Sequence, residues 1–311
     1  MSLLSVSLFG RFQTWSNNKQ VLLDIEGRKE QELLCYLLTY RNRPHSREVL
    51  ANLLWHDSSS TRSKSYLRKA LWQLQNALES LVKSLSSPLL LVESDWIQLN
   101  TSTELWLDVE EFEKAFNLVQ GISGATLDPM QVQALKNALD LYQGELLENW
   151  YQNWCLYERE KFKHLYLTMQ DKLLDHYEAR HDYEAGLVHG LRILQHDQAR
   201  ERTHRRLMRL LYLKGDRTAA LRQYERCVSA LEEELGVKPS QRTISLCERI
   251  KQGKSETPVQ PPTQTDPMLP LANILLSEVL VHLKELHLVM FNFQDQVQKK
   301  IELIEQTIPP S

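Results

Sequence analysis

Residues 60–78 read STRSKSYLRKALWQLQNAL, and this stretch decides the fold. Its leucines recur at helical spacing and fall within about 60° of one another at ~100° per residue; they are Leu67, Leu71, Leu74 and Leu78. The first half of the stretch carries four cations, Arg62, Lys64, Arg68 and Lys69. A helix N-terminus already has partial positive charge, so cations there are favourable when an external anion binds against them.

The face opposite the leucines combines cations, amides, a hydroxyl and an indole ring, which are the groups that contact phosphates and base edges. It carries Arg62, Ser65, Lys69, Trp72, Gln73 and Asn76, with Tyr66 and Arg68 on its flanks. A solvated basic face is the alternative interpretation. With two basic residues from the preceding segment, the predicted DNA-contacting set is Arg43, Arg47, Arg62, Lys64, Ser65, Tyr66, Arg68, Lys69, Trp72, Gln73 and Asn76.

The surrounding segments place this helix third in a recognisable order. Residues 3–25 alternate with period two and predict a small antiparallel sheet. A helix is expected at 32–40, and Ser46 is expected to cap a short second helix. After the third helix, LLLVE (89–93) and WIQLN (96–100) predict a β-hairpin with a tight turn at Ser94–Asp95. A sheet, three helices and a hairpin are the layout of a winged helix-turn-helix, whose third helix enters the DNA major groove.

Charge is unevenly distributed along the chain. The net charge of the 311 residues is −3, so the whole protein is not basic. Residues 27–69, however, contain nine Lys and Arg against four Asp and Glu, a local excess of five positive charges. A basic segment in an acidic chain favours a localised anion-binding surface.

After Thr103 the sequence predicts an almost entirely helical chain with an internal repeat. Residues 173–194 align with residues 207–228 at an offset of 34, and the alignment pairs Asp182 with Asp216 and Ala185 with Ala219. A period of 34 residues is typical of tetratricopeptide repeats, in which each unit is a helical hairpin.

The C-terminal part contains two further segments that differ in composition from the repeat region. Residues 253–270 contain five prolines and predict an extended linker. Residues 271–308 then predict one long amphipathic helix with a heptad seam, formed by Leu276, Val279, Leu283, Leu286, Met290, Phe293 and Val297. A coiled coil that makes a homodimer or higher homo-oligomer is one interpretation, and a helix folded back on the repeat domain is the other.

Catalytic, metal and membrane signals are weak. The four cysteines have no CxxC spacing and are expected to be buried free thiols. No metal-binding or nucleophile–base pattern is apparent, so we predict no cofactor, no metal and no enzymatic activity. The start lacks a signal peptide pattern, and charges interrupt the apolar stretch at 269–293. A cytoplasmic protein without membrane contact is expected.

Several stretches, taken in order, resemble a known family: SLFGRF (7–12), SREVLANLLWHDSSSTRSKSYLRKALWQLQNAL (46–78), LWLDVEEFEKA (105–115), LYQGELL (141–147), RERTHRRLMRLLYLKGDRTAALRQYERC (200–227) and LEEELGVKPSQRT (231–243). The chain resembles the antibiotic-regulatory-protein (SARP) type of bacterial transcription regulators. These join an OmpR-type winged helix to a bacterial transcriptional activator domain.

The resemblance implies a mainly α protein with a winged helix-turn-helix domain at 1–105 and a tetratricopeptide-like activator domain at 106–252. It also implies sequence-specific binding to double-stranded promoter DNA as a dimer, and activation through contact with RNA polymerase. One departure is the hairpin turn, where Glu93 and Asp95 stand in place of the usual glycine and cations. Two carboxylates repel phosphate, so a strong contact from this wing is not expected. The alternative function is a protein-interaction scaffold whose winged helix no longer binds DNA.

Overall fold

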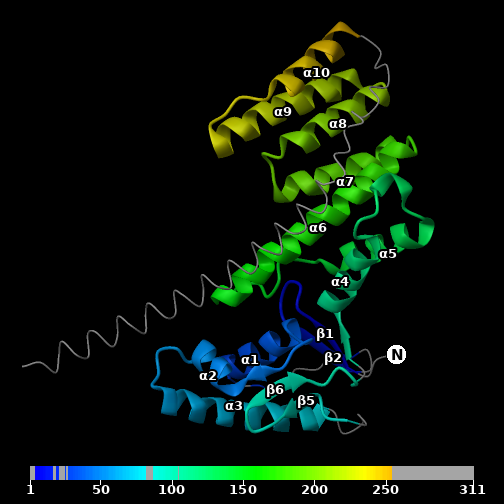
Figure 1. Ribbon diagram of the computed structural model, residues 1–311. Helices are drawn as coiled ribbons and strands as arrows, with labels where there is room; N and C mark the ends of the chain where they lie inside the picture. Colours follow the sequence, from blue (N-terminus) through cyan, green and yellow to red (C-terminus); the bar gives the residue numbers. More distant parts are fainter. Residues whose placement is uncertain are drawn as a thin grey trace, which may run out of the picture. The chain divides into compact units, whose positions relative to one another are not determined.

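The computed structural model describes residues 4–16, 19–20, 25, 27–81, 87–103 and 105–253 (Figure 1). Its strands are β1 (Leu4–Ser7), β2 (Gln13–Ser16), β3 (Lys19–Gln20), β4 (His45–Ser46), β5 (Leu90–Val92), β6 (Trp96–Leu99) and β7 (Leu105–Leu107). Its helices are α1 (Arg28–Thr39), α2 (Arg47–Leu54), α3 (Ser60–Leu81), α4 (Asp108–Val119), the short 3₁₀ helix η1 (Gly124–Thr126), α5 (Pro129–Leu141), α6 (Asn153–Ala179), α7 (Tyr183–His196), α8 (Glu201–Leu213), α9 (Arg217–Leu235) and α10 (Gln241–Gln252). The predicted order of a winged helix followed by a helical repeat domain is confirmed.

The first sheet has the strand order β3-β2-β1-β7. Strands β1 and β2 are antiparallel, as the alternating sequence predicts. Strand β7 pairs parallel to β1, with Leu4 opposite Leu105. The part of the chain after Thr103 is almost entirely helical, as predicted, and this strand is a short exception that the sequence does not show, because three residues are too few to display a period of two. The predicted domain boundary between residues 105 and 106 falls inside this strand.

Helices α1, α2 and α3 pack together beside the second sheet, whose strand order is β4-β6-β5. Strands β5 and β6 form the predicted hairpin, with the Glu93 amide donating to the Trp96 carbonyl at 2.9 Å. Strand β4 is only two residues long, pairs with β6 and leads directly into α2. Ser46 precedes α2, but its side chain makes no capping hydrogen bond, contrary to expectation.

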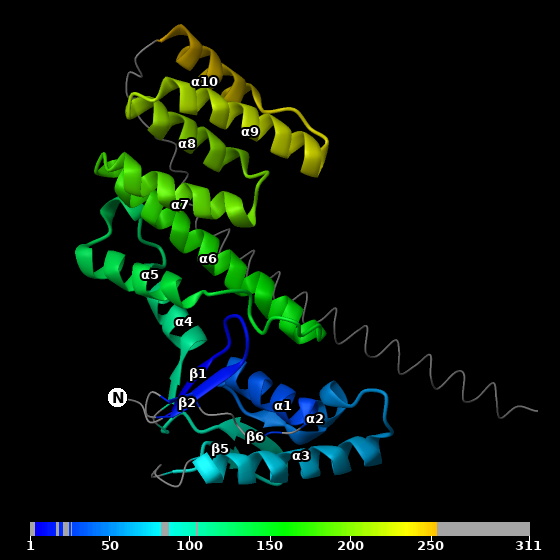
Figure 2. The same ribbon diagram turned by 180° about the vertical axis from the view of Figure 1, so that it is seen from behind.

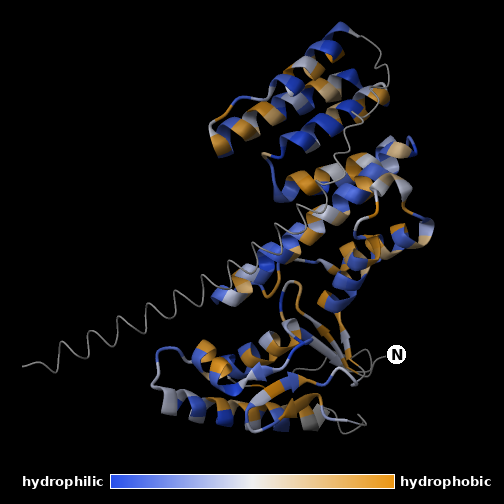
Figure 3. Cartoon of the chain, viewed as in Figure 1, coloured by the Kyte–Doolittle hydropathy of each residue, from blue (hydrophilic) through white to orange (hydrophobic). Residues whose placement is uncertain are grey.

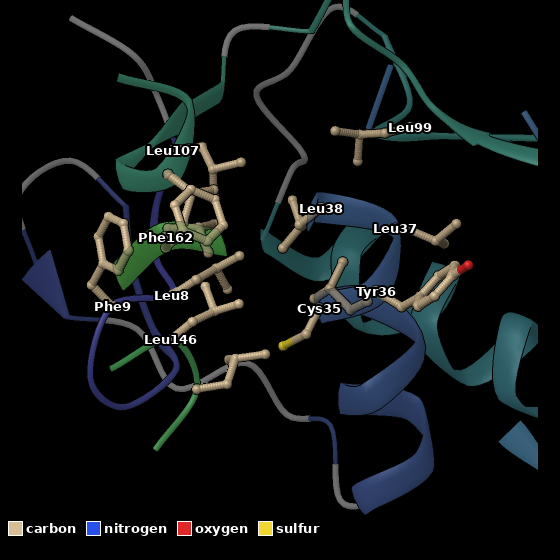
Figure 4. Packing of buried hydrophobic residues seen from close by; sticks show 14 of the residues in the cluster. Leu8, Phe9, Cys35, Tyr36, Leu37, Leu38, Leu99, Leu107, Leu146 and Phe162 are labelled. Atoms are coloured by element: carbon tan, nitrogen blue, oxygen red, sulfur yellow. The ribbon is translucent and has the colours of Figure 1, made fainter. Parts of the chain in front are cut away.

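One hydrophobic core runs from β1 through α1 into α6 (Figure 4). Phe9 belongs to this core, with its ring centroid 5.0 Å from that of Phe112 and 5.3 Å from that of Phe162. The backbone after β1 also pairs with the segment before α6, because the Leu147 amide donates to the Leu8 carbonyl at 2.8 Å. The winged helix and the first helices of the repeat domain therefore share their interior.

Asp108 fixes the junction between the two parts. Its buried carboxylate accepts hydrogen bonds from the amides of Leu8, Phe9 and Val109, at 2.7–2.9 Å, and from the Ser7 hydroxyl. Burial raises the pKa of Asp108, and the hydrogen bonds from Ser7 and the amides oppose that shift. The first residue of α4 thus satisfies the backbone where β1 ends.

Ion pairs surround the same junction. The buried Arg41 guanidinium contacts Glu113 at 2.6 Å and Glu110 at 3.6 Å. Lys161 contacts Glu113 at 3.0 Å and the buried Glu158 at 3.1 Å. Arg41 is one of the nine cations of the basic segment, but its charge is paired with these two carboxylates inside the protein.

Helices α6 to α10 follow one another in a stack, each packed against the next (Figure 2). Most of these helices carry both hydrophobic and hydrophilic residues (Figure 3). The predicted repeat is visible in the helix caps. The Asp182 carboxylate accepts from the Ala185 amide, and the Asp216 carboxylate accepts from the Ala219 amide, 34 residues later.

A buried polar pair also repeats, with its residues exchanged. His189 Nδ1 lies 2.6 Å from Gln170 Oε1, between α7 and α6. At the positions 34 residues later, Gln223 Nε2 lies 2.8 Å from His204 Nδ1, between α9 and α8. The geometry of the helical hairpin therefore retains a histidine–glutamine contact whichever helix supplies the imidazole.

The contact between His189 and Gln170 is expected to make the stability of the protein sensitive to acid. Burial, with the nearby Arg192 and Lys136, lowers the pKa of His189 from 6.5 to about 4. Above pH 6.5 His189 is neutral in both states; between pH 6.5 and 4 only the unfolded chain takes up the proton. The free energy of unfolding is expected to lose about 3 kcal/mol over that range.

The check is chemical denaturation of the intact protein and of His189→Gln between pH 7 and 4. As pH falls, the unaltered protein should lose about 3 kcal/mol more of its free energy of unfolding than His189→Gln loses. His164→Gln, at an exposed position, is the matched control. Equal pH dependence in all three proteins would contradict the assignment.

All four cysteines are buried and free, as predicted. In the part of the chain that the structure describes, no helix is long and apolar enough to span a bilayer. The predicted linker and the predicted heptad seam at 271–308 lie outside the described residues.

Candidate nucleic-acid interface

Helix α3 is amphipathic as predicted, and extends from Ser60 to Leu81. The leucine stripe is fully buried against α1 and α2: Leu67, Leu71, Leu74 and Leu78. Ser63 is also buried, and its hydroxyl donates to the carbonyls of Ser59 and Ser60 in the first turn. The leucines fix the rotation of the helix about its axis, so the polar face points away from the core.

The outward face of α3 is exposed over its described length. Exposed positions among the predicted contacts are Arg62, Lys64, Ser65, Tyr66, Arg68, Lys69, Trp72 and Asn76. Trp72 is 65% exposed and Tyr66 is 45% exposed, which is unusual for large aromatic side chains. Gln73 differs, because its amide oxygen is buried without a hydrogen-bond partner.

The cations on α3 differ in their partners. Lys64 pairs with Glu48 of α2 at 2.9 Å, and both side chains are about half exposed or more. Such a surface pair contributes about 0–1 kcal/mol, so a phosphate can replace the carboxylate. Arg62, Arg68 and Lys69 have no acidic partner among the residues that the structure describes. Three guanidinium and ammonium groups on this helix are therefore available to an external anion.

Arg43 and Arg47 have partners within the winged helix itself. The Arg43 guanidinium lies 5.1 Å from the centre of the Tyr40 ring, so its contacts are with the aromatic side chains of α1. Arg47 Nη1 donates to the Glu93 carbonyl at 2.9 Å, and its amide donates to the Asp95 carbonyl at 2.9 Å. Both residues belong to the predicted DNA-contacting set, and the structure gives each of them a partner inside the winged helix.

The hairpin tip is acidic and exposed. Glu93 and Asp95 form no ion pair with any residue in the described ranges. The Ser94 hydroxyl donates to the Asp95 carboxylate at 3.2 Å. The wing therefore presents two full negative charges to the surroundings.

The exposed face of α3 thus combines cations, hydrogen-bond donors and two aromatic rings, opposite the buried leucine stripe. The exposed groups on α3 donate hydrogen bonds or stack, which is what phosphate oxygens and base edges require. Within the described residues, no group of three or more His, Cys, Asp or Glu is placed to hold a metal ion.

The comparisons with known proteins agree with this architecture. Residues 107–251 match the bacterial transcriptional activator domain family. Among solved structures, the chain is similar to that of Mycobacterium tuberculosis EmbR in complex with low affinity phosphopeptide, with 19% sequence identity and a TM-score of 0.59. That similarity covers 82% of this chain and 67% of the other, and at this identity it speaks for the fold alone. No curated protein matches the chain.

The chain joins a winged helix-turn-helix to a domain that matches this family, and the two share one core. Residues 107–251 form a bacterial transcriptional activator domain. The predicted activator domain is confirmed over these residues, and the similarity to EmbR agrees with the predicted fold.

Proposed function

We propose that this activator binds specific promoter sequences by placing α3 in the DNA major groove. The observation that carries the proposal is the exposed face of α3, where Arg62, Arg68 and Lys69 have no acidic partner among described residues while the leucine stripe is buried. In winged helix-turn-helix proteins the corresponding helix reads the groove. The available charge and the position in the fold point to the same surface.

The orientation of α3 about its axis suggests which of its residues contact base edges and which contact phosphates. At ~100° per residue, Ser65, Lys69 and Asn76 lie most directly opposite the leucine stripe. We assign them to base edges, which a hydroxyl, an ammonium and an amide can recognise by hydrogen bonds. Lys64 and Arg68 lie on one flank of this line and are assigned to the phosphate backbone.

The activator domain supports a role beyond DNA binding. We propose that it recruits RNA polymerase to the promoter, as its family description implies. Because the winged helix and this domain share a core, DNA binding would hold the domain in a defined orientation beside the duplex.

We also propose that the segment 271–308 pairs with a second copy of the chain. Six large apolar residues of its heptad seam would otherwise face water, and burial of each is worth about 1.5–3 kcal/mol. Pairing would place two winged helices on neighbouring half-sites and raise the effective concentration of the second.

Truncation after Gln252 is expected to convert a dimer or higher oligomer into a monomer and to weaken binding to a two-half-site operator. The contact of one winged helix with one half-site should be unchanged. Light scattering on the intact and truncated chains measures the assembly. If both proteins contain the same number of chains per particle, residues before 253 are responsible for self-association instead.

The alternative function, a protein-interaction scaffold without DNA binding, is favoured by one observation, the acidic and unpaired wing tip. A genome-wide binding footprint separates the two. The proposed function requires discrete sites with a shared sequence, and the recovered fragments must bind the purified protein more tightly than shuffled copies at 0.15 M salt. A footprint without enriched sites would support the scaffold.

A further inference from the structure

The wing is joined to the start of α2 by a continuous set of hydrogen bonds. Strand β4 pairs with β6, with His45 opposite Ile97 and Ser46 opposite Trp96. The next residue, Arg47, continues the contact from its amide to the Asp95 carbonyl and from its side chain to the Glu93 carbonyl. Arg47 therefore bridges both sides of the turn that carries the two carboxylates.

This contact uses groups that would otherwise be free for phosphate. The amides in the first turn of a helix lack intrahelical partners and attract anions. Here the Arg47 amide, the first of α2, is occupied by a wing carbonyl, and the Ser46 side chain makes no cap. The Arg47 guanidinium, the nearest cation in sequence, is held by the same turn.

From this geometry we infer that Arg47 is a positioning residue that fixes an acidic wing beside α2, so that the wing repels the DNA backbone and specificity rests on α3. This inference relies on the proposed DNA binding. A wing that grips the backbone adds affinity for every sequence alike, because phosphates carry no sequence information. A wing that repels the backbone lowers binding to all sequences, and only duplexes that satisfy the base-reading face of α3 overcome the loss.

Two kinds of variant test the charge of the wing and its attachment to Arg47 separately, and the measured quantity is the affinity for a random-sequence 30-base-pair duplex. Removal of the charges in Glu93→Gln/Asp95→Asn should tighten binding about three- to tenfold at 0.1 M salt, since two like charges near the backbone are lost. Arg47→Met removes a positive charge, yet it should leave the dependence of log K on log salt unchanged, because no phosphate contact is lost. In the Glu93→Gln/Asp95→Asn background, Arg47→Met should have no further effect on affinity.

The matched control is Arg62→Met, the same substitution at an exposed arginine of α3. It should weaken binding and reduce the salt slope by about 0.9, the amount expected for one phosphate contact. Hydrogen exchange of the peptide covering residues 93–97, measured without DNA, should speed up in Arg47→Met and stay unchanged in Arg62→Met.

The outcomes separate the inference from the proposed function. If Arg47→Met weakens binding and reduces the slope as Arg62→Met does, Arg47 is a phosphate contact and the inference is overturned, while DNA binding stands. Unchanged affinity in Glu93→Gln/Asp95→Asn, or unchanged exchange in Arg47→Met, overturns it equally. If the unaltered protein binds neither random duplex nor footprint fragments, the proposed function itself fails, and the role in specificity fails with it.

Discussion

Alanine at Arg62, Lys64, Arg68 and Lys69 together is expected to abolish DNA binding while the fold stays intact. All four side chains are exposed and none belongs to the leucine stripe, so the core loses nothing. Loss of up to four phosphate or base contacts should reduce the salt slope by about three to four and the affinity by more than about 100-fold at physiological salt. Fluorescence anisotropy on a footprint fragment measures both quantities.

A second quadruple variant controls for net charge. Arg202, Arg222, Arg226 and Arg242 are exposed arginines of the repeat domain, and their replacement by alanine removes the same four charges. This variant should bind DNA nearly as the unaltered protein does. Equal losses in the two variants would mean that overall charge, and not the face of α3, determines binding.

Phe9→Ala is expected to lower the free energy of unfolding by about 3–5 kcal/mol, the cost of removing a fully packed aromatic ring. The Phe9 ring contacts Phe112, Tyr142 and Phe162, all of which lie beyond the first 105 residues. Because typical domains are stable by about 5–15 kcal/mol, the variant should melt far earlier and should expose both parts of the chain together. Chemical denaturation followed by tryptophan fluorescence and by circular dichroism reports on the two parts.

Met130→Ala is the matched control, because Met130 is 82% exposed and its truncation should cost little. The same argument predicts that residues 1–105 produced alone do not form a stable domain. They lack Phe112, Leu146 and Phe162, which cover Phe9, and they lack Asp108, which binds the amides at the end of β1. A cooperative unfolding transition of that fragment, with the stability of the intact chain, would contradict the shared core.

Much of this architecture is predictable from local patterns. The leucine spacing in α3, the hairpin turn before Trp96 and the 34-residue offset between Asp182 and Asp216 are local signals, and each is confirmed. The first two depend on residues within a few turns of one another, where periodicity carries the information, and the third is a direct match between two segments of the sequence. The exposed face of α3 followed directly, because a buried stripe determines which residues point outward.

The parts that sequence reasoning missed depend on partners far away in the chain. Strand β7 is defined by its pairing with β1, about 100 residues earlier. Arg41, Arg43 and Arg47 look alike in sequence, yet an acidic pair from α4, a tyrosine ring and the wing carbonyls give them three different environments. The cations of α3 face outward, because its leucines already use the opposite face.

The shared core around Phe9 also bears on promoter geometry. A winged helix seated in the groove turns with the double helix, and a domain built on the same core must turn with it. If the binding site moved by roughly five base pairs, half a turn of the duplex, the activator domain would lie on the opposite side of the DNA. In a regulator whose activator domain is attached through a flexible linker, the domain could still reach its partner after such a shift. In this protein Asp108 ties the first helix of the activator domain to the end of β1, so under the proposed function the helical phase between operator and polymerase site would be part of what the promoter must encode.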